Sequence, residues 1–123
     1  MNKYSILIVE DDKWLAEQNE RVLMSAGYKT KVSLNALIAI KEIDDSPPDA
    51  IILDVLLTGS TAFALLHELQ SYGDTSDIPI ILCTNLAKEL SLEKLIPYGV
   101  RQIIDKTTMV PNDLILALKR ELL

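Results

Sequence analysis

The amino-acid sequence predicts an α/β fold in which helices cover both faces of a five-stranded parallel sheet. Short apolar runs alternate along the chain with longer segments of helical pattern, and strands that are connected through helices run parallel. Most of these runs are apolar at nearly every position, which is typical of strands buried on both faces. The predicted strands are 4–9, 28–32, 50–53, 80–83 and 102–104, and the predicted helices are 13–26, 35–44, 62–72, 87–96 and 113–122.

Capping and breaking residues separate the elements in the first half of the chain. The first strand ends at an acidic loop whose last residue, Asp12, suits the N-cap of the following helix. Gly27 stands where a helix-ending glycine belongs. Pro47 and Pro48 stop the second helix. The strongly apolar third strand then closes at Asp54.

Similar signals separate the elements in the second half. The 58–61 segment is a polar loop before the third helix, and Pro79 leads into the fourth strand, which ends at Thr84. Pro97 and Gly99 end the fourth helix. The fifth strand is short and is followed by Lys106.

Length, charge and cysteine content exclude several classes of protein. A chain of 123 residues suits one domain, and the net charge of −6 argues against direct binding to nucleic acid or to an anionic membrane. Cys83, the single cysteine, cannot form an internal disulfide. The apolar run 6–9 is too short for a signal peptide or a membrane span. We therefore expect the protein in the cytoplasm.

Polar side chains follow four of the predicted strands, namely Glu10 with Asp11, Asp54, Thr84 and Lys106. Ligands of open parallel sheets bind outside the carboxyl ends of the strands. Three carboxylates gathered there stay ionised together when a cation lies among them, and a few oxygen ligands suit Mg²⁺ better than Ca²⁺. Any one of these residues alone is more often a cap or a solvated side chain. Together they predict a site for a phosphoryl group, with a lysine and a hydroxyl to hold its oxygens.

These residues resemble the receiver domain of bacterial two-component response regulators. The segments that carry the resemblance are 6–12, which ends in the acidic pair, 48–54, 79–84 and Lys106. The resemblance spans 1–123 and implies a single receiver domain with no output domain in this chain. It also implies a doubly wound, flavodoxin-like fold.

The resemblance implies a phosphoacceptor and a metal site. Asp54 would accept a phosphoryl group from the phosphohistidine of a sensor histidine kinase or phosphotransfer protein, or from a small acyl phosphate. Asp11, Asp54 and the backbone carbonyl of Leu56 would bind Mg²⁺, with Mn²⁺ as a substitute, and Glu10 would act on the metal through water. The domain would not be an enzyme in the usual sense, because it would catalyse only its own phosphorylation and dephosphorylation.

The resemblance also implies the switching step. Lys106 would pair with Asp54 and then with a phosphoryl oxygen, while Thr84 would move toward another and change a surface read by an unknown downstream protein. Leu56 and Leu86 occupy positions that set access of the hydrolytic water. Both are apolar, so we expect slow dephosphorylation.

Several positions depart from the family pattern. Thr58 replaces a proline, and Thr61-Ala62 replaces an Asp-Gly pair in the loop after the phosphoacceptor strand. Ile103 replaces an aromatic switch residue, so the usual coupled threonine–aromatic rotation cannot operate in its usual form. Thr107 replaces a cis proline, and a trans bond is expected because a cis bond without proline costs about 3 kcal/mol.

Three other functions were weighed against the phosphoacceptor. A pseudo-receiver, which binds partners without phosphotransfer, is favoured by the departures and opposed by the intact strand-end residues. A haloacid-dehalogenase-type phosphatase would need an acid at Leu56, and a dinucleotide-binding fold would need a glycine-rich loop that the four dispersed glycines cannot form. On the last helix, Leu116 and Leu123 offer a candidate surface for a partner or a homodimer.

Overall fold

The computed structural model describes residues 4–54, 61–71, 73 and 75–122. Its five strands are β1 (Ser5–Val9), β2 (Lys29–Ser33), β3 (Ala50–Leu53), β4 (Ile80–Thr84) and β5 (Val100–Asp105). They form a sheet in the order β2-β1-β3-β4-β5, and every neighbouring pair is parallel. The predicted parallel sheet is therefore confirmed.

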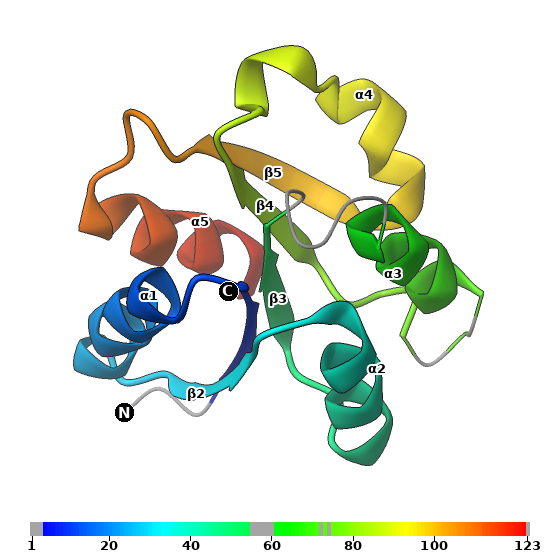
Figure 1. Ribbon diagram of the computed structural model, residues 1–123, viewed down its shortest axis with the longest axis horizontal. Coiled ribbons are helices and arrows are strands. Elements are labelled where there is room, and N and C mark those ends of the chain that lie inside the picture. The colour runs from blue at the N-terminus through cyan, green and yellow to red at the C-terminus, as the bar shows by residue number, and fades with distance from the viewer. Residues whose placement is uncertain (1–3, 55–60, 72, 74, 123) are drawn as a thin grey trace.

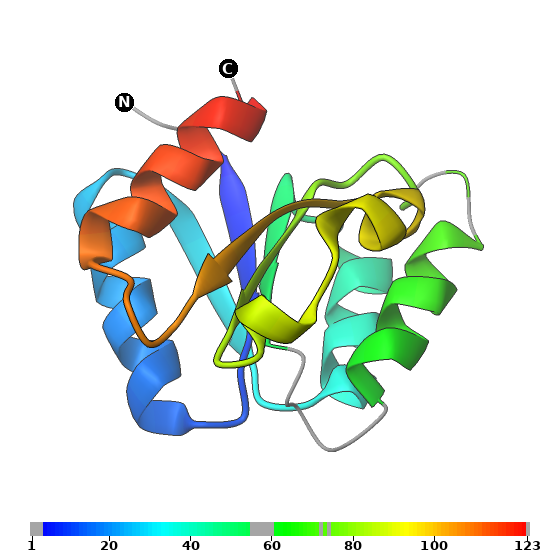
Figure 2. The same ribbon diagram turned by 90° about the horizontal axis from the view of Figure 1, so that it is seen from above.

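Helices cover both faces of the sheet (Figure 1). The α-helices are α1 (Lys13–Ser25), α2 (Ala36–Asp45), α3 (Thr61–Gln70), α4 (Leu92–Leu95) and α5 (Pro111–Leu122), and the 3₁₀ turns are η1 (Ala87–Glu89) and η2 (Ile96–Tyr98). Helices α1 and α5 lie on one face, while α2 and α3 lie on the other (Figure 2). Within the described residues, no helix has the length and hydropathy needed to cross a bilayer.

Two apolar cores explain why the strands are apolar at successive positions. On β1, Leu7 and Val9 join the core beneath α2 and α3, whereas Ile6 and Ile8 join the core beneath α1 and α5. All four side chains are at most 3% exposed. Because side chains alternate between the faces of a strand, a sheet covered on both faces requires apolar residues throughout.

Most of the predicted helix ends follow from capping. The Asp12 side chain accepts a hydrogen bond from the Leu15 N–H at 3.3 Å, which begins α1. Asn35, which was predicted as the first residue of the second helix, is instead its N-cap and accepts from the Ile38 N–H at 2.9 Å. Gly27 follows α1 with a φ of 91°, a left-handed conformation that favours glycine.

The predicted helix over 87–96 is wrong in form, because the segment is divided. It consists of η1, the four-residue α4 and η2. Leu90 and Ser91 between them have extended backbone, with ψ values of 147° and 117°. The Leu90 N–H bonds back to the Ala87 carbonyl at 3.3 Å, which closes the first turn before α4 begins.

Strand β5 and helix α5 both begin two residues earlier than predicted. Val100 is fully buried and pairs with Ile80, and a bulge at this point places Gln102 opposite Ile81. Helix α5 begins at Pro111, whose fixed φ and missing N–H suit a first helical position. The Asp113 carboxylate accepts the Val110 N–H at 2.9 Å, so Asp113 caps the helix rather than starting it.

Candidate functional site

The carboxyl ends of β1, β3, β4 and β5 bring together the polar residues that the sequence singled out. The Asp54 N–H donates to the Val9 carbonyl at 3.2 Å, and the Lys106 N–H donates to the Thr84 carbonyl at 3.0 Å. These bonds hold the first residues beyond the strands in the same register as the sheet. The site is thus assembled by backbone pairing between strands that are distant in the sequence.

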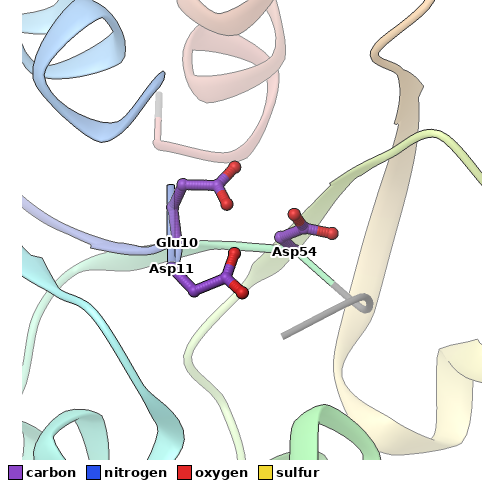
Figure 3. A group of neighbouring side chains, drawn as sticks. All are labelled: Glu10, Asp11 and Asp54. Atoms are coloured by element: carbon purple, nitrogen blue, oxygen red, sulfur yellow. The ribbon is translucent and has the colours of Figure 1, made fainter. Parts of the chain in front are cut away.

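Three carboxylates form the acidic part of the site. Glu10 and Asp11 extend from the end of β1 toward the side where Asp54 leaves β3 (Figure 3). One oxygen from each carboxylate lies within 4.8 Å of the others. Glu10 and Asp54 are only 3% and 4% exposed, whereas Asp11 is exposed. The cluster therefore has two buried members and one member open to solvent.

Lys106 bridges the two buried carboxylates. Its Nζ donates to Glu10 Oε1 and, at 2.6 Å, to Asp54 Oδ2. Its side chain is 11% exposed. Burial alone would lower the pKa of Lys106, but the hydrogen bonds to Asp54 and Glu10 outweigh it and raise that pKa above the ordinary value. Lys106 is therefore firmly charged at neutral pH.

The surroundings of Glu10 shift its pKa. Burial raises its pKa to about 7, and the nearby charge of Asp54 acts in the same direction. The hydrogen bond and charge of Lys106 oppose this rise without cancelling it. Glu10 Oε2 also accepts a hydrogen bond from the Asp12 N–H at 3.2 Å, which holds the Glu10 carboxylate against the backbone of the loop after β1. A second positive charge at this edge would favour the ionised form of Glu10.

Thr84 is fully buried at the end of β4. Its hydroxyl oxygen accepts a hydrogen bond from the Leu86 N–H at 3.0 Å. In this conformation the side chain therefore caps the turn that follows the strand. The sequence had offered two roles for Thr84, a cap or a hydroxyl that holds a phosphoryl oxygen, and the capping role is the one seen here. Leu86 is half-buried and packs against the core on the α2 and α3 face.

Two departures from the family pattern lie on and after β5. Ile103 is half-buried and packs against the same core as Leu86. The bond between Lys106 and Thr107 is trans, as expected, since no peptide bond among the described residues is cis. The Thr107 N–H and hydroxyl both donate to Asp105 Oδ1, at 2.9 and 2.6 Å. These hydrogen bonds lower the pKa of Asp105, and a proline at 107 would lack the N–H donor.

Some predicted residues lie outside the site or outside the described part of the chain. Leu56, Thr58 and Leu123 fall outside the described residues, so their roles stay predictions. Leu116 on α5 is 45% exposed. Cys83 packs in the core beneath α1 and α5, and burial raises the pKa of its thiol to about 12.

Sequence reasoning missed Ser33, the last residue of β2. Its carbonyl accepts the Glu10 N–H at 3.1 Å, so it lies beside the acidic loop. The side chain is fully buried, and its hydroxyl has no hydrogen-bond partner among the described residues. In the sequence, a serine at the end of an edge strand resembles a turn residue, and only the folded structure shows that it is buried.

Comparison with known proteins agrees with this geometry. The family model described as the response regulator receiver domain matches residues 6–119. The response regulator MprA of Mycobacterium sp. (strain KMS) is 33% identical over 79 residues, which are 64% of this chain and 34% of MprA. The aligned part thus spans about a third of the length of this curated relative.

Solved structures extend the similarity to nearly the whole chain. A sensor protein from Polaromonas sp. JS666 has a TM-score of 0.88 at 28% identity and is matched over 96% of this chain and 94% of its own. The signal receiver domain of a signal transduction histidine kinase from Syntrophus aciditrophicus has a TM-score of 0.81 at 31% identity, over 97% and 89% of the two chains. The flavodoxin-like, receiver-type fold is confirmed.

Proposed function

The chain belongs to the response regulator receiver domain family, and from this premise we propose that Asp54 accepts a phosphoryl group in a Mg²⁺-dependent reaction. The donor is the phosphohistidine of a sensor histidine kinase or phosphotransfer protein, in two-component signalling in the cytoplasm. The observation that carries the proposal is the contact of Lys106 Nζ with both Glu10 and Asp54 beside the exposed Asp11. Residues 1–123 act as one receiver domain.

The donor set of this edge fits a hard divalent cation. Glu10, Asp11 and Asp54 supply only carboxylate oxygens, which Mg²⁺ and Mn²⁺ prefer, and they carry more negative charge than Lys106 balances. Asp11 and Asp54 would hold the ion together with the backbone carbonyl of Leu56, and Glu10 would act through water. When bound, the ion supplies positive charge that offsets the charge of the reacting phosphoryl oxygens.

Asp54 is the nucleophile of the proposed transfer. One of its carboxylate oxygens forms a bond to phosphorus while the bond between phosphorus and the donor's histidine nitrogen breaks. The bonding pair leaves with the imidazole nitrogen. Lys106, which donates to Asp54 Oδ2 at 2.6 Å, stays charged throughout and moves its hydrogen bond to a phosphoryl oxygen.

Thr84 supplies the switching step of the proposal. Its hydroxyl now accepts the Leu86 N–H, and turning toward a phosphoryl oxygen would break this bond and release the turn before η1. Because Ile103 is aliphatic and packed against the core, the signal to a downstream protein passes through this turn rather than through rotation of an aromatic ring. The apolar Leu56 and Leu86 give the phosphorylated form a long lifetime.

Intact mass after incubation with acetyl phosphate tests the proposal. We expect a Mg²⁺-dependent gain of one phosphoryl group that is lost in Asp54→Ala. Asp77→Ala, which removes an exposed aspartate elsewhere in the chain, is the matched control and should be phosphorylated normally. No gain in the folded wild-type protein with Mg²⁺ would contradict the proposal and favour a pseudo-receiver.

A further inference from the structure

Helices α2 and α3 both carry large exposed apolar side chains. Leu37 is 81% exposed, and Ile38 and Phe63 are 47% and 44% exposed. On α1 the exposed apolar side chains are Trp14 and Leu15 near its start and Met24 near its end. Water contact with exposed apolar side chains is unfavourable, and an exposed apolar group that borders a groove commonly marks an interaction site.

The same face has a groove beside its most exposed side chain. About 370 Å³ of space lies between α2 and α3, lined by Leu37, Ile40, Ala64, Leu65 and Glu68 among others. Leu37 projects at one side of this groove, and the small side chain of Ala64 lies at the other. A projecting apolar group and a receiving groove on one face are what a self-complementary, two-fold interface requires.

Charge on this face is also self-complementary. Lys41 follows Leu37 by four residues on α2, and Glu68 follows Ala64 by four residues on α3. Residues four apart lie on the same side of a helix, one turn along it. Each helix therefore has a small or apolar position followed one turn later by a charge, and the two charges are opposite.

The two helices run in the same direction, which fixes how two copies would pair. Helix α2 follows β2 and α3 follows β3, so both start from the edge of the sheet where parallel strands end, and they lie side by side in Figure 2. A two-fold axis parallel to them brings α2 of one copy against α3 of the other at the same level. Leu37 then meets Ala64, and Lys41 meets Glu68, twice in each dimer.

We propose that a second copy of this chain occupies the α2–α3 face, defined by Leu37, Lys41, Ala64 and Glu68. The Leu37 side chain of each copy enters the groove of the other, and two Lys41–Glu68 pairs flank the apolar centre. This homodimer does not depend on phosphorylation of Asp54. It lies on the opposite face of the sheet from α5, where Leu116 offered the earlier candidate surface.

Sedimentation equilibrium over a concentration series tests the proposed dimer. We expect reversible self-association of the wild-type protein and a dissociation constant raised at least about tenfold by Leu37→Glu, which loses an apolar contact on both copies. Glutamate in the first turn of a helix is well tolerated, so the variant should remain folded by circular dichroism. Leu116→Glu on α5 is the matched control and should leave association unchanged.

Charge reversal tests the register of the interface. Lys41→Glu and Glu68→Lys should each weaken the dimer about fivefold, because two like-charge pairs replace two attractive ones. The double variant should restore wild-type affinity. A protein that is monomeric up to millimolar concentration, a dimer broken by Leu116→Glu instead of Leu37→Glu, or a double variant as weak as the single variants would each overturn the proposal.

Discussion

The ends of β1 and β2 are neighbours in the sheet, yet they bury polar groups in opposite ways. Beyond β1, Glu10 is buried as a member of an ionic cluster in which Lys106 contacts both buried carboxylates. At the end of β2, the fully buried Ser33 hydroxyl has no hydrogen-bond partner within the described residues. This contrast shows that burial alone does not determine the free-energy cost of placing a polar group in the interior, because that cost depends on the group's hydrogen-bond and charge partners.

Removal of the shared lysine should have the largest effect of the predicted changes. Lys106→Met leaves two carboxylates buried side by side without a cation, which should lower the free energy of unfolding by about 3 kcal/mol at pH 8. The loss should shrink at pH 5, where one carboxyl can take up a proton. Urea unfolding without divalent ions measures both, with the exposed Lys119→Met as control. An equal loss at both pH values would contradict this account.

A pH dependence of stability centred on Glu10 should come next in size. Its pKa is about 7 in the folded protein against 4.5 as the ordinary value, so between these limits the folded state binds more protons than the unfolded state. The free energy of unfolding should therefore fall by about 2 kcal/mol as pH rises through this window. Lys106 is charged in both the folded and the unfolded protein over this pH range, so it does not contribute to the pH dependence of the free energy of unfolding.

Substitution of Glu10 isolates its share of this pH dependence. Urea unfolding of Glu10→Gln across the same pH range should give a flatter profile, whereas the exposed Glu89→Gln should keep the wild-type slope. A wild-type slope retained in Glu10→Gln would assign the titration to another group.

The smallest effects should be of opposite sign at two buried hydroxyls. Ser33→Ala removes a hydroxyl that lacks a partner and should raise the free energy of unfolding by up to about 1 kcal/mol. Thr84→Val removes the acceptor of the Leu86 N–H and should lower it by about 1 kcal/mol. Thermal or urea unfolding of the two single variants checks the signs, and a loss of stability in Ser33→Ala would contradict the comparison.

The sheet, the two-sided core and the members of the ionic cluster could all be predicted from the amino-acid sequence. Apolar runs such as 50–53 can be satisfied only between two layers of helices, and the first polar residue after each run must then lie at the sheet edge. Asp12 caps the start of α1 and Gly27 follows its end, both as predicted, because helix capping depends only on a few neighbouring residues. The resemblance to receiver domains that these ordered positions indicated is confirmed by the family model, which matches residues 6–119.

Other features of the protein depend on contacts between segments that are distant in the sequence, and these features could not be predicted. The division of 87–98 into short turns and the early start of β5 depend on the pairing of Val100 with Ile80 across the sheet. The strength of the ionic cluster depends on how deeply Glu10 and Asp54 are buried. The lack of a hydrogen-bond partner for the Ser33 hydroxyl among the described residues likewise depends on how the layers pack around the end of β2. None of these can be read from local patterns, because burial and partnership are properties of the assembled layers rather than of neighbouring residues.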